Sequence, residues 1–419
     1  MAASPVVSVI VPVYNNERHA AAALRSVLAQ TFHVWELLVV DDGSTDRTPD
    51  VLAQFAGEPR VTLMRQANAG PAAARNAGIR RARGEFVAFL DGDDEWLPAY
   101  LATLLALAER QPTAAVYYCS AQCMDGDGRD LPQVAAARRV APGDMYVTLL
   151  RANFLVPSAV LARRAALEEA GLFDPSEALR SAEDWDMWLR LAHIRPFAGT
   201  QACLARYRLH AASLMADPAR HKRAAQAVVE KHFGLDDGQP AGWPPDKRTA
   251  YGGLYRLHAL AALMRQGDWA DCGPYLRRAL RADTSLALDL DLFYELALGA
   301  QPMGYRGTAH QLDLPRNAAH VQHLLSQVFR SPAGLELAGV RRAASGAAWF
   351  ALGLAAYNTG QLALCRRYLL CALRAWPALW REKRLVLPLL KSLLGRAALE
   401  AARDFSRRRS SRPEGAGQP

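Results

Sequence analysis

The chain has 419 residues, of which 51% are hydrophobic and 22% charged, which describes an ordinary soluble globular protein with enough sequence for two or three domains. No apolar stretch approaches the roughly 20 residues of a membrane-spanning helix, and the first residues lack the pattern of an export signal, so we expect a cytoplasmic protein. The formal charge of +9 favours an anionic partner such as a membrane surface, a phosphate-bearing substrate or nucleic acid, without choosing among them.

The first hundred residues alternate strand and helix patterns. The predicted strands, which are short and rich in apolar or β-branched residues, cover residues 6–14, 35–40, 61–66 and 84–90. The predicted helices cover residues 20–28, residues 49–55 and the segment that begins near Pro71. Strands that alternate with helices in this way predict an α/β fold with buried parallel strands.

Two of these strands end in acidic turns. The second strand ends in Asp41-Asp42-Gly43-Ser44, and the fourth ends in Asp91-Gly92-Asp93-Asp94. In open α/β sheets, ligands bind beyond the carboxyl ends of the strands. We therefore place the candidate site at these turns.

The alternation is less regular from residue 96 to residue 215 and gives way to helical patterns after it. We expect a helix over 97–110, a strand over 115–123 and a helix after Ser181. Residues 347–377 carry apolar and small residues at the offsets of a tetratricopeptide helical hairpin, and residues 255–283 repeat the pattern faintly, so we predict stacked helical hairpins. The expected domains are 1–215, with a nucleotide-binding half (1–95) and an acceptor half (96–215), an all-helical domain (216–405) and a disordered basic tail (406–419).

Asp91-Gly92-Asp93 is the clearest candidate for a metal site. Two carboxylates one residue apart at a strand end can share a hard divalent cation and leave positions open for substrate phosphates. The alternative is an ordinary turn, because Asp-Gly is a common turn pair.

Six segments, in this order and approximate spacing, resemble the family 2 glycosyltransferases, whose nucleotide-sugar-binding fold is called GT-A. They are VSVIVPVYN, LRSVLAQTF, WELLVVDDGSTDRT, NAGPAAARNAGI, GEFVAFLDGDDEW and SAEDWDMWLRLA, and together they extend over about half of the chain. The resemblance implies an inverting hexosyl- or N-acetylhexosaminyl-transferase that moves a sugar from a nucleotide-sugar to an acceptor, such as an enzyme of polysaccharide biosynthesis.

By this resemblance, the donor nucleotide binds beside the first two strands. Pro12, Tyr14 and Asn15 would line its pocket, and Asp42 would accept a hydrogen bond from a uracil ring, which makes a UDP-sugar the expected donor. A carboxylate can equally accept from a ribose hydroxyl, and Asp42 can also be an ordinary acid at a helix N-terminus.

The segment from Asn68 to Asn76 would approach the nucleotide from the other side. Here Asn68 would line the pocket and Gly70 would allow the backbone to approach the nucleotide closely. Arg75 would offer its charge to the phosphates. The alternative for Arg75 is a solvated or ion-paired surface arginine.

The resemblance also assigns the metal ligands. Asp93 would be the principal ligand of Mn²⁺ or Mg²⁺, and Asp91, with Gly92 beside it, would contact the ribose or reach the metal through water. His210, shortly after a predicted strand, would contact the metal or the diphosphate, although a lone histidine is often a core or surface residue.

Asp184, in the Glu183-Asp184-Trp185 segment, would be the general base that takes the acceptor proton. Without the upstream motifs, Glu183 and Asp184 would be ordinary acids of a helix N-terminus. Of Trp185 and Trp188, one would floor a sugar pocket and the other would pack inward.

The remaining expectations concern partners and alternatives. The acceptor would be a saccharide, a lipid-linked saccharide or a protein, and no nucleic acid is expected. The helical domain would bind a protein partner, recognise the acceptor or form a dimer. The leucine-rich, basic stretch 385–409 suggests a helix on the inner face of the cell membrane, or else a capping helix with a basic end. The alternative functions are a nucleotidyltransferase, whose Gly-rich phosphate loop is missing after the first strand, and a helical-repeat interaction protein with a degenerate transferase domain.

Overall fold

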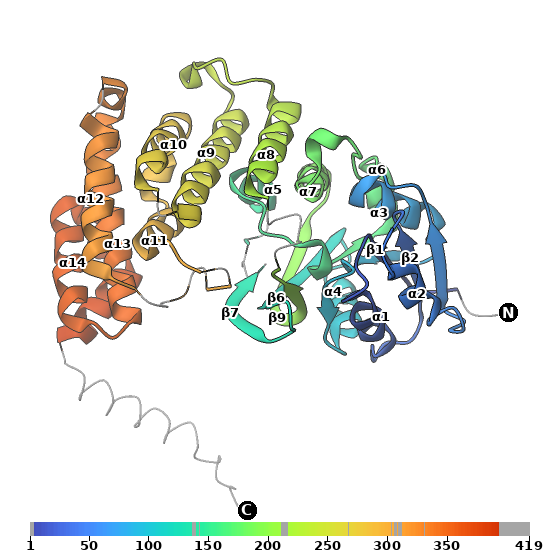
Figure 1. Cartoon of the computed structure of the whole chain (residues 1–419). Coiled ribbons are helices and arrows are strands. Elements are labelled where there is room, and N and C mark those ends of the chain that lie inside the picture. Colours follow the sequence, from blue (N-terminus) through green and yellow to red (C-terminus); the bar gives the residue numbers. More distant parts are fainter. Residues whose placement is uncertain are drawn as a thin grey trace, which may run out of the picture. The chain divides into compact units, whose positions relative to one another are not determined.

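The structure is a computed structural model with two compact units (Figure 1). It describes residues 4–135, 140–141, 143–210, 217–266, 268–302, 304–305, 308, 312–330 and 332–393. Unit 1 comprises Met1–Leu254 and Pro302–Arg306, and unit 2 comprises Tyr255–Gln301 and Gly307–Pro419. The expected domain limits at residues 215 and 405 stay predictions, and the basic tail lies outside the described residues.

Unit 1 is built on one mixed sheet of nine strands within the described residues, in the order β3-β2-β1-β4-β8-β6-β9-β5, with β7 paired to β6. The strands are β1 (Val7–Val13), β2 (Trp35–Asp41), β3 (Val61–Arg65), β4 (Phe86–Phe89), β5 (Glu95–Trp96), β6 (Val116–Met124), β7 (Asp130–Ala135), β8 (Val160–Arg163) and β9 (Phe197–Arg208). β1, β2, β3 and β4 pair in parallel, whereas β4 pairs with β8, and β8 with β6, in antiparallel fashion. The predicted α/β fold is confirmed.

The carboxyl ends of the central parallel strands meet at one edge of the sheet. All residues of β2 and β4, and six of the seven in β1, are buried, as expected of strands that are covered on both faces. Val13 of β1 pairs with Asp41 of β2, and Leu90 after β4 donates its N–H to Ile10 O at 3.0 Å. Because β1 lies between β2 and β4, the two acidic turns predicted from the sequence leave the same edge of the sheet on either side of the end of β1.

Unit 1 also contains α-helices. They are α1 (Ala20–Leu28), α2 (Thr48–Ala53), α3 (Gly70–Arg81), α4 (Tyr100–Arg110), α5 (Met145–Arg151), α6 (Arg164–Glu169), α7 (Glu183–Ile194), α8 (Pro218–Phe233) and the first part of α9 (Pro245–Gln266). α3 packs very closely on β1, since a β-carbon on Gly78 would lie 2.5 Å from Cγ2 of Ile10. The glycine therefore lets α3 approach the sheet and bring its N-terminus to the edge that carries the acidic turns.

The described part of unit 2 is helical. Its helices are the second part of α9, α10 (Trp269–Ala282), α11 (Leu290–Leu298), α12 (Leu314–Arg330), α13 (Arg341–Asn358), α14 (Leu362–Ala375) and a helix over 383–393. α13 and α14 form the predicted hairpin, in which a β-carbon on Gly353 would clash with the Leu369 side chain. The all-helical character is confirmed, and the tetratricopeptide assignment stays a prediction.

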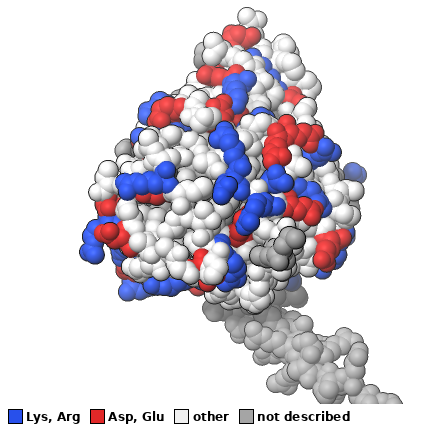
Figure 2. Space-filling model, turned by 90° about the vertical axis from the view of Figure 1, so that its right-hand side faces the viewer, with Lys and Arg blue, Asp and Glu red and all other residues white. Residues whose placement is uncertain are grey.

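The described surface is charged in a mixed pattern. Figure 2 shows one face, on which Lys and Arg side chains lie among Asp and Glu side chains rather than in a single basic field. Exposed ion pairs such as Arg195–Glu169, at 2.7 Å, illustrate the same mixture. In the described part of the chain, no helix is both long enough and apolar enough to cross a membrane.

Candidate functional site

The loops after β1 and β2 are bonded to each other. Asn15 adopts a left-handed φ of 45°, and its Oδ1 accepts the N–H of Thr45 at 2.8 Å. Its own N–H donates to Ser44 Oγ at 3.0 Å. These bonds fix the end of β1, where Pro12 is partly buried and the Tyr14 side chain is 46% exposed. An exposed aromatic ring on a fixed loop is suited to cover a flat ligand.

Asp42 closes the next part of the site. Its Oδ1 accepts bonds from Gln66 Nε2 at 2.7 Å and from Ala69 N at 3.0 Å, and its Oδ2 accepts from Gly70 N at 2.8 Å. Gly70 has a φ of +86°, which suits glycine, and Asn68 is exposed just before it. Asp42 is 3% exposed and holds the start of α3 through these three bonds.

The acidic loop after β4 packs directly on the end of β1. A β-carbon on Gly92 would lie 3.1 Å from Pro12 O and 3.2 Å from Asn16 Nδ2, so this position has space only for a small residue. Asp91 donates its N–H to Ser158 Oγ at 3.0 Å. The loop is thus held from two sides, by β1 and by the segment before β8.

Asp94 is a structural anchor of this loop. It is 1% exposed, and its two carboxylate oxygens accept bonds from Ser158 Oγ at 2.5 Å and from Arg208 N at 2.8 Å. Burial, together with the charges of Asp93 and Asp91, raises its pKa well above the usual range. Asp94 therefore joins β9 to the acidic loop.

Arg75 of α3 joins the acidic loop to the start of α7. The guanidinium is 4% exposed, and it lies 2.6 Å from Asp91 Oδ1 and 2.9 Å from Glu183 Oε1. Since Asp184 follows Glu183 directly, the two acid motifs predicted from the sequence come together around one arginine. Both ends of the guanidinium are engaged, and the predicted contact of Arg75 with phosphate stays a prediction.

Asp184 lies at the N-terminus of α7. Its Oδ2 accepts a hydrogen bond from Asn153 Nδ2 at 3.0 Å, and its Oδ1 accepts the N–H of Trp185 at 2.8 Å. Burial, and then the neighbouring charge of Glu183, raise the pKa of Asp184 to about 7. A carboxylate with a pKa in this range is matched to proton transfer near neutral pH.

His210 follows β9 and reaches the acidic loop. Its Nε2 lies 2.8 Å from Asp93 Oδ2, and the two side chains are 20% and 26% exposed. The His19 ring packs against it, with ring centroids 5.5 Å apart. Among the described residues, no group of three His, Cys, Asp or Glu side chains is arranged to hold a metal ion. Asp93 and His210 still supply two adjacent side chains of the types that bind divalent cations.

The Tyr207 hydroxyl is near the acids of the loop after β4 and near Asp184. Burial, and then the charges of Asp94, Asp93, Asp91 and Asp184, raise the pKa of its hydroxyl well above the usual range. Its sequence neighbours Arg206 and Arg208 both pair with Glu95, at 2.9 Å and 2.6 Å. The end of β9 therefore lies along the acidic loop.

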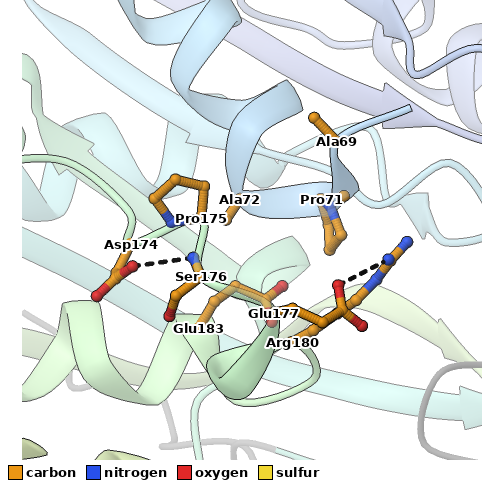
Figure 3. A pocket seen from close by; sticks show the side chains of 10 residues that line it. Ala69, Pro71, Ala72, Asp174, Pro175, Ser176, Glu177, Arg180 and Glu183 are labelled. Carbon is orange, nitrogen blue, oxygen red and sulfur yellow. Dashed lines mark hydrogen bonds and ion pairs between the residues drawn. The ribbon is translucent and has the colours of Figure 1, made fainter. Parts of the chain in front are cut away.

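Glu183 also lines a small pocket (Figure 3). It lies between the start of α3, at Gly70 and Pro71, and the segment from Asp174 to Arg180. Its acids and its arginine are mostly paired with neighbours, since Arg180 pairs with Glu177 at 3.1 Å.

Sequence reasoning missed the polar residues that hold the acids in place. They lie in irregular segments or at strand ends, and their only sequence signal is that they are polar; they are His19, Gln66, Asn153, Ser158, Tyr207 and Arg208. The expectation that Trp185 or Trp188 would floor an open pocket is not met in this structure. Both side chains are buried, and Trp185 Nε1 donates to Leu149 O at 2.8 Å.

Comparison with known proteins identifies the family of this site. Residues 8–171 match the family model described as glycosyl transferase family 2. The uncharacterized glycosyltransferase alr2836 of Nostoc sp. strain PCC 7120 is 32% identical over 237 residues, which cover 54% of this chain and 69% of that protein. The putative colanic acid biosynthesis glycosyl transferase WcaA of Escherichia coli K12 is 31% identical, over 45% of this chain and 66% of that protein.

The shared region differs in extent between relatives. The chain covers 33% of the length of an uncharacterized glycosyltransferase of Rickettsia felis. Among solved structures, residues 1–349 of Staphylococcus aureus TarS align with a TM-score of 0.48 at 18% identity, over 85% of this chain and 92% of that chain. Since more than two thirds of the Nostoc protein is matched at 32% identity, the chain belongs to glycosyltransferase family 2, and unit 1 has the GT-A fold of that family.

Proposed function

We propose that the chain transfers a sugar from a nucleotide-sugar to an acceptor hydroxyl by a single displacement that inverts the anomeric centre. The observation that carries this proposal is the bridge through Arg75, which pairs with Asp91 at 2.6 Å and with Glu183 at 2.9 Å. The buried Arg75 guanidinium thus brings the acidic loop, proposed for the leaving group, next to the start of α7, which carries the proposed base.

The donor nucleotide is proposed to bind along the carboxyl edge of β1 and β2. Tyr14 is exposed there, and Pro12 and Asn15 flank it on a loop that is fixed by hydrogen bonds. The Asp42 carboxylate is proposed to accept the N–H of a uracil ring, which favours a UDP-sugar. Asn68 and Gly70 close the pocket from the start of α3.

Asp93 and His210 fit a divalent cation. Their polar atoms lie 2.8 Å apart in a hydrogen bond, which a cation bound between them would replace, and both side chains are partly exposed. Asp91, through the oxygen that Arg75 does not hold, is proposed to contact the ribose or to reach the metal through water. Magnesium and manganese at such sites take one or two protein carboxylates, with the remaining positions filled by water and substrate phosphates. Such an ion would supply charge stabilisation for the leaving diphosphate.

Asp184 is proposed as the general base. As the acceptor oxygen forms its bond to the anomeric carbon and the bond from that carbon to the diphosphate breaks, the hydroxyl proton moves to the Asp184 carboxylate. Asn153 orients this carboxylate through the bond at 3.0 Å. The Arg75–Glu183 pair fixes the residue that precedes it.

The substrate classes follow from chemistry and from the relatives. A hexose or an N-acetylhexosamine is proposed as the sugar, and a growing saccharide, free or lipid-linked, or a protein as the acceptor. WcaA is described as acting in the synthesis of colanic acid, and a similar place in polysaccharide synthesis is proposed for this chain.

The proposal is tested by mass spectrometry of sugar release and transfer from a panel of UDP- and GDP-sugars, with and without Mn²⁺. We expect Asp184→Asn to lower turnover by about 10²–10⁴-fold while donor binding is kept. Asp93→Ala should weaken both turnover and donor binding. Glu109→Gln, which changes an exposed acid of α4, is the matched control and should leave both unchanged.

The same experiment separates the alternatives. A nucleotidyltransferase would release pyrophosphate from a nucleoside triphosphate and a sugar phosphate, which we expect not to occur. A nonenzymatic interaction protein would bind the donor without any turnover. Full turnover in Asp184→Asn would overturn the assignment of the base.

A further inference from the structure

The last described helix, over residues 383–393 in unit 2, has one face packed in the unit and one face outside it. Leu385 is fully buried and Ser392 is 2% exposed. On the opposite face, Leu387, Leu390 and Leu393 are 54%, 53% and 61% exposed. The helix is therefore docked in unit 2 and still turns large apolar side chains outward.

A tryptophan shortly before this helix is also exposed. Trp380 is 64% exposed and lies at the end of a short 3-10 helix (Pro377–Arg381), directly before the helix over 383–393. One short segment thus exposes a tryptophan and three leucines to solvent. Large exposed apolar patches on a protein surface mark interaction sites. We call these four residues the C-terminal apolar surface.

Basic residues lie between and beside the residues of the C-terminal apolar surface in the sequence. Arg381, Lys383, Arg384 and Lys391 are all exposed. Of these, Arg384 pairs with Glu382 at 3.3 Å, whereas Lys383 and Lys391 form no ion pair within the part of the chain that the structure describes. At 3.6 residues per turn, Lys383, Leu387 and Lys391 lie in one row along the outer face.

We propose that the C-terminal apolar surface and its basic border bind an anionic lipid bilayer in its interfacial layer. Leucine side chains of a helix that lies in the membrane plane enter the boundary between headgroups and acyl chains, and tryptophan prefers that layer. Lysine and arginine at the border meet anionic headgroups. This inference goes beyond the transfer reaction and does not depend on it.

The positive charges beside the C-terminal apolar surface favour an anionic bilayer over a second copy of this chain as its partner. Two copies that met through this surface would bring the like charges of Lys383 and Lys391 together, which opposes association. An anionic bilayer instead offers opposite charge to the border and apolar depth to the leucines. The membrane contact expected from the sequence of 385–409 lies mostly outside the described residues, so the observations here are an independent basis for it.

The test is sedimentation of the full chain with vesicles of phosphatidylcholine, with and without phosphatidylglycerol. We expect binding to the anionic vesicles that weakens with salt. The triple variant Trp380→Ser, Leu387→Ser, Leu390→Ser should bind roughly tenfold or more weakly, because it removes the apolar groups that enter the bilayer. The variant Lys383→Gln, Arg384→Gln, Lys391→Gln should lose most of the salt dependence.

Leu235→Ser is the matched control, because Leu235 is 71% exposed and lies in unit 1. It should bind like the unchanged protein, and circular dichroism should show all variants folded. A second readout is the blue shift of tryptophan fluorescence on vesicle binding, which Trp380→Phe should reduce. The proposal is overturned if the unchanged chain does not bind anionic vesicles, if the triple variant binds equally well, or if ultracentrifugation shows a dimer that the triple variant dissociates.

Discussion

At the scale of single residues, the candidate site is governed by how buried charges are compensated. Arg75 offers one positive charge to Asp91 and Glu183, so Asp184 is left beside an acid with only the Asn153 amide and a backbone N–H as donors. Burial and the charge of Glu183 then raise the pKa of Asp184 to about 7. The same contacts that assemble the site therefore also set the basicity of the proposed base.

The first prediction concerns the pH dependence of activity. The base works when deprotonated, so kcat/KM should fall as pH drops below about 7, the pKa of Asp184. Asn153 donates to the charged form of Asp184 and lowers its pKa, so Asn153→Ala should move this limb to higher pH. The measurement is the pH–rate profile of both proteins. Asn358→Ala, which removes an exposed amide in unit 2, should leave the profile unchanged. A limb that stays at the same pH in Asn153→Ala would show that this hydrogen bond does not tune the base.

The second prediction concerns the Arg75 bridge and stability. Arg75→Met leaves two poorly exposed carboxylates without a counter-charge, and we expect the free energy of unfolding to fall by about 3–5 kcal/mol. Arg75→Lys keeps the charge but cannot span both acids, so its loss should be smaller. Urea unfolding measures both variants.

A double-mutant cycle isolates the coupling between Arg75 and Glu183. Glu183→Gln in the Arg75→Met background removes one of the uncompensated charges, so the double variant should be less destabilised than the sum of the two single variants. Additive losses would contradict the proposed bridge.

Residue types at strand ends could be predicted from the sequence, whereas their supports could not. Asp42, Asp91 and Asp93 follow apolar strands in a recognisable order, and the parallel register brings them to one edge. Ser158 and Asn153 come from irregular segments far along the chain, and their contacts with the acids exist only after the second half of the sheet has folded. Asp94 belongs to the same acidic turn as Asp93, but its oxygens are engaged by Ser158 and Arg208.

At the scale of elements, α7 is held by its neighbour α8 through one buried acid. The Asp186 side chain is fully buried and lies 2.8 Å from Arg190 NH2, 2.8 Å from Lys231 Nζ and 3.0 Å from His232 Nε2. Burial opposes its ionisation, but the hydrogen bonds from His232 and Lys231 outweigh burial and lower the pKa of Asp186. The helix that carries Asp184 is thus clamped three residues after its start.

The third prediction follows from this clamp. Asp186→Asn should lower the free energy of unfolding by about 1.5–3 kcal/mol near neutral pH, because hydrogen bonds between charged groups are lost. A carboxyl with a lowered folded-state pKa stabilises the protein above its unfolded pKa of about 3.9 and loses this contribution as pH falls through the folded value. The difference between Asp186→Asn and the unchanged protein should therefore be constant above about pH 5 and shrink in acid. Urea unfolding as a function of pH measures it, and a difference independent of pH would contradict the role of the charge.

The elements that sequence reasoning found are those with a strong local pattern. β1, β2 and β4 are apolar runs, and α1 repeats its buried residues every three or four positions. β5 has only two residues, which is too short for a periodic signal. Proline usually interrupts a helix, yet residues 383–393 are helical on both sides of Pro388. Such elements exist because of the partners they pack against, which no local pattern records.

At the scale of the whole molecule, the chain has two compact units with separate cores. The proposed site lies entirely in unit 1, and the C-terminal apolar surface lies in unit 2. A ligand that binds only the folded state of one unit stabilises that unit by mass action. A ligand of unit 1 should therefore raise the unfolding temperature of unit 1 and leave that of unit 2 unchanged.

The fourth prediction is that calorimetry resolves two unfolding transitions, of which UDP with Mn²⁺ shifts one. At about 100 times the dissociation constant, the ligands should add about 2.7 kcal/mol to the stability of unit 1, which corresponds to roughly 5 °C for a unit of this size. The transition that these ligands leave unchanged is then assigned to unit 2. Asp93→Ala should lose the shift caused by the metal but keep both transitions, because the change removes a partly exposed carboxylate and no core contact. If both transitions moved together, the two units would unfold as one, and if neither moved, the carboxyl edge of β1 and β2 would not be the donor site.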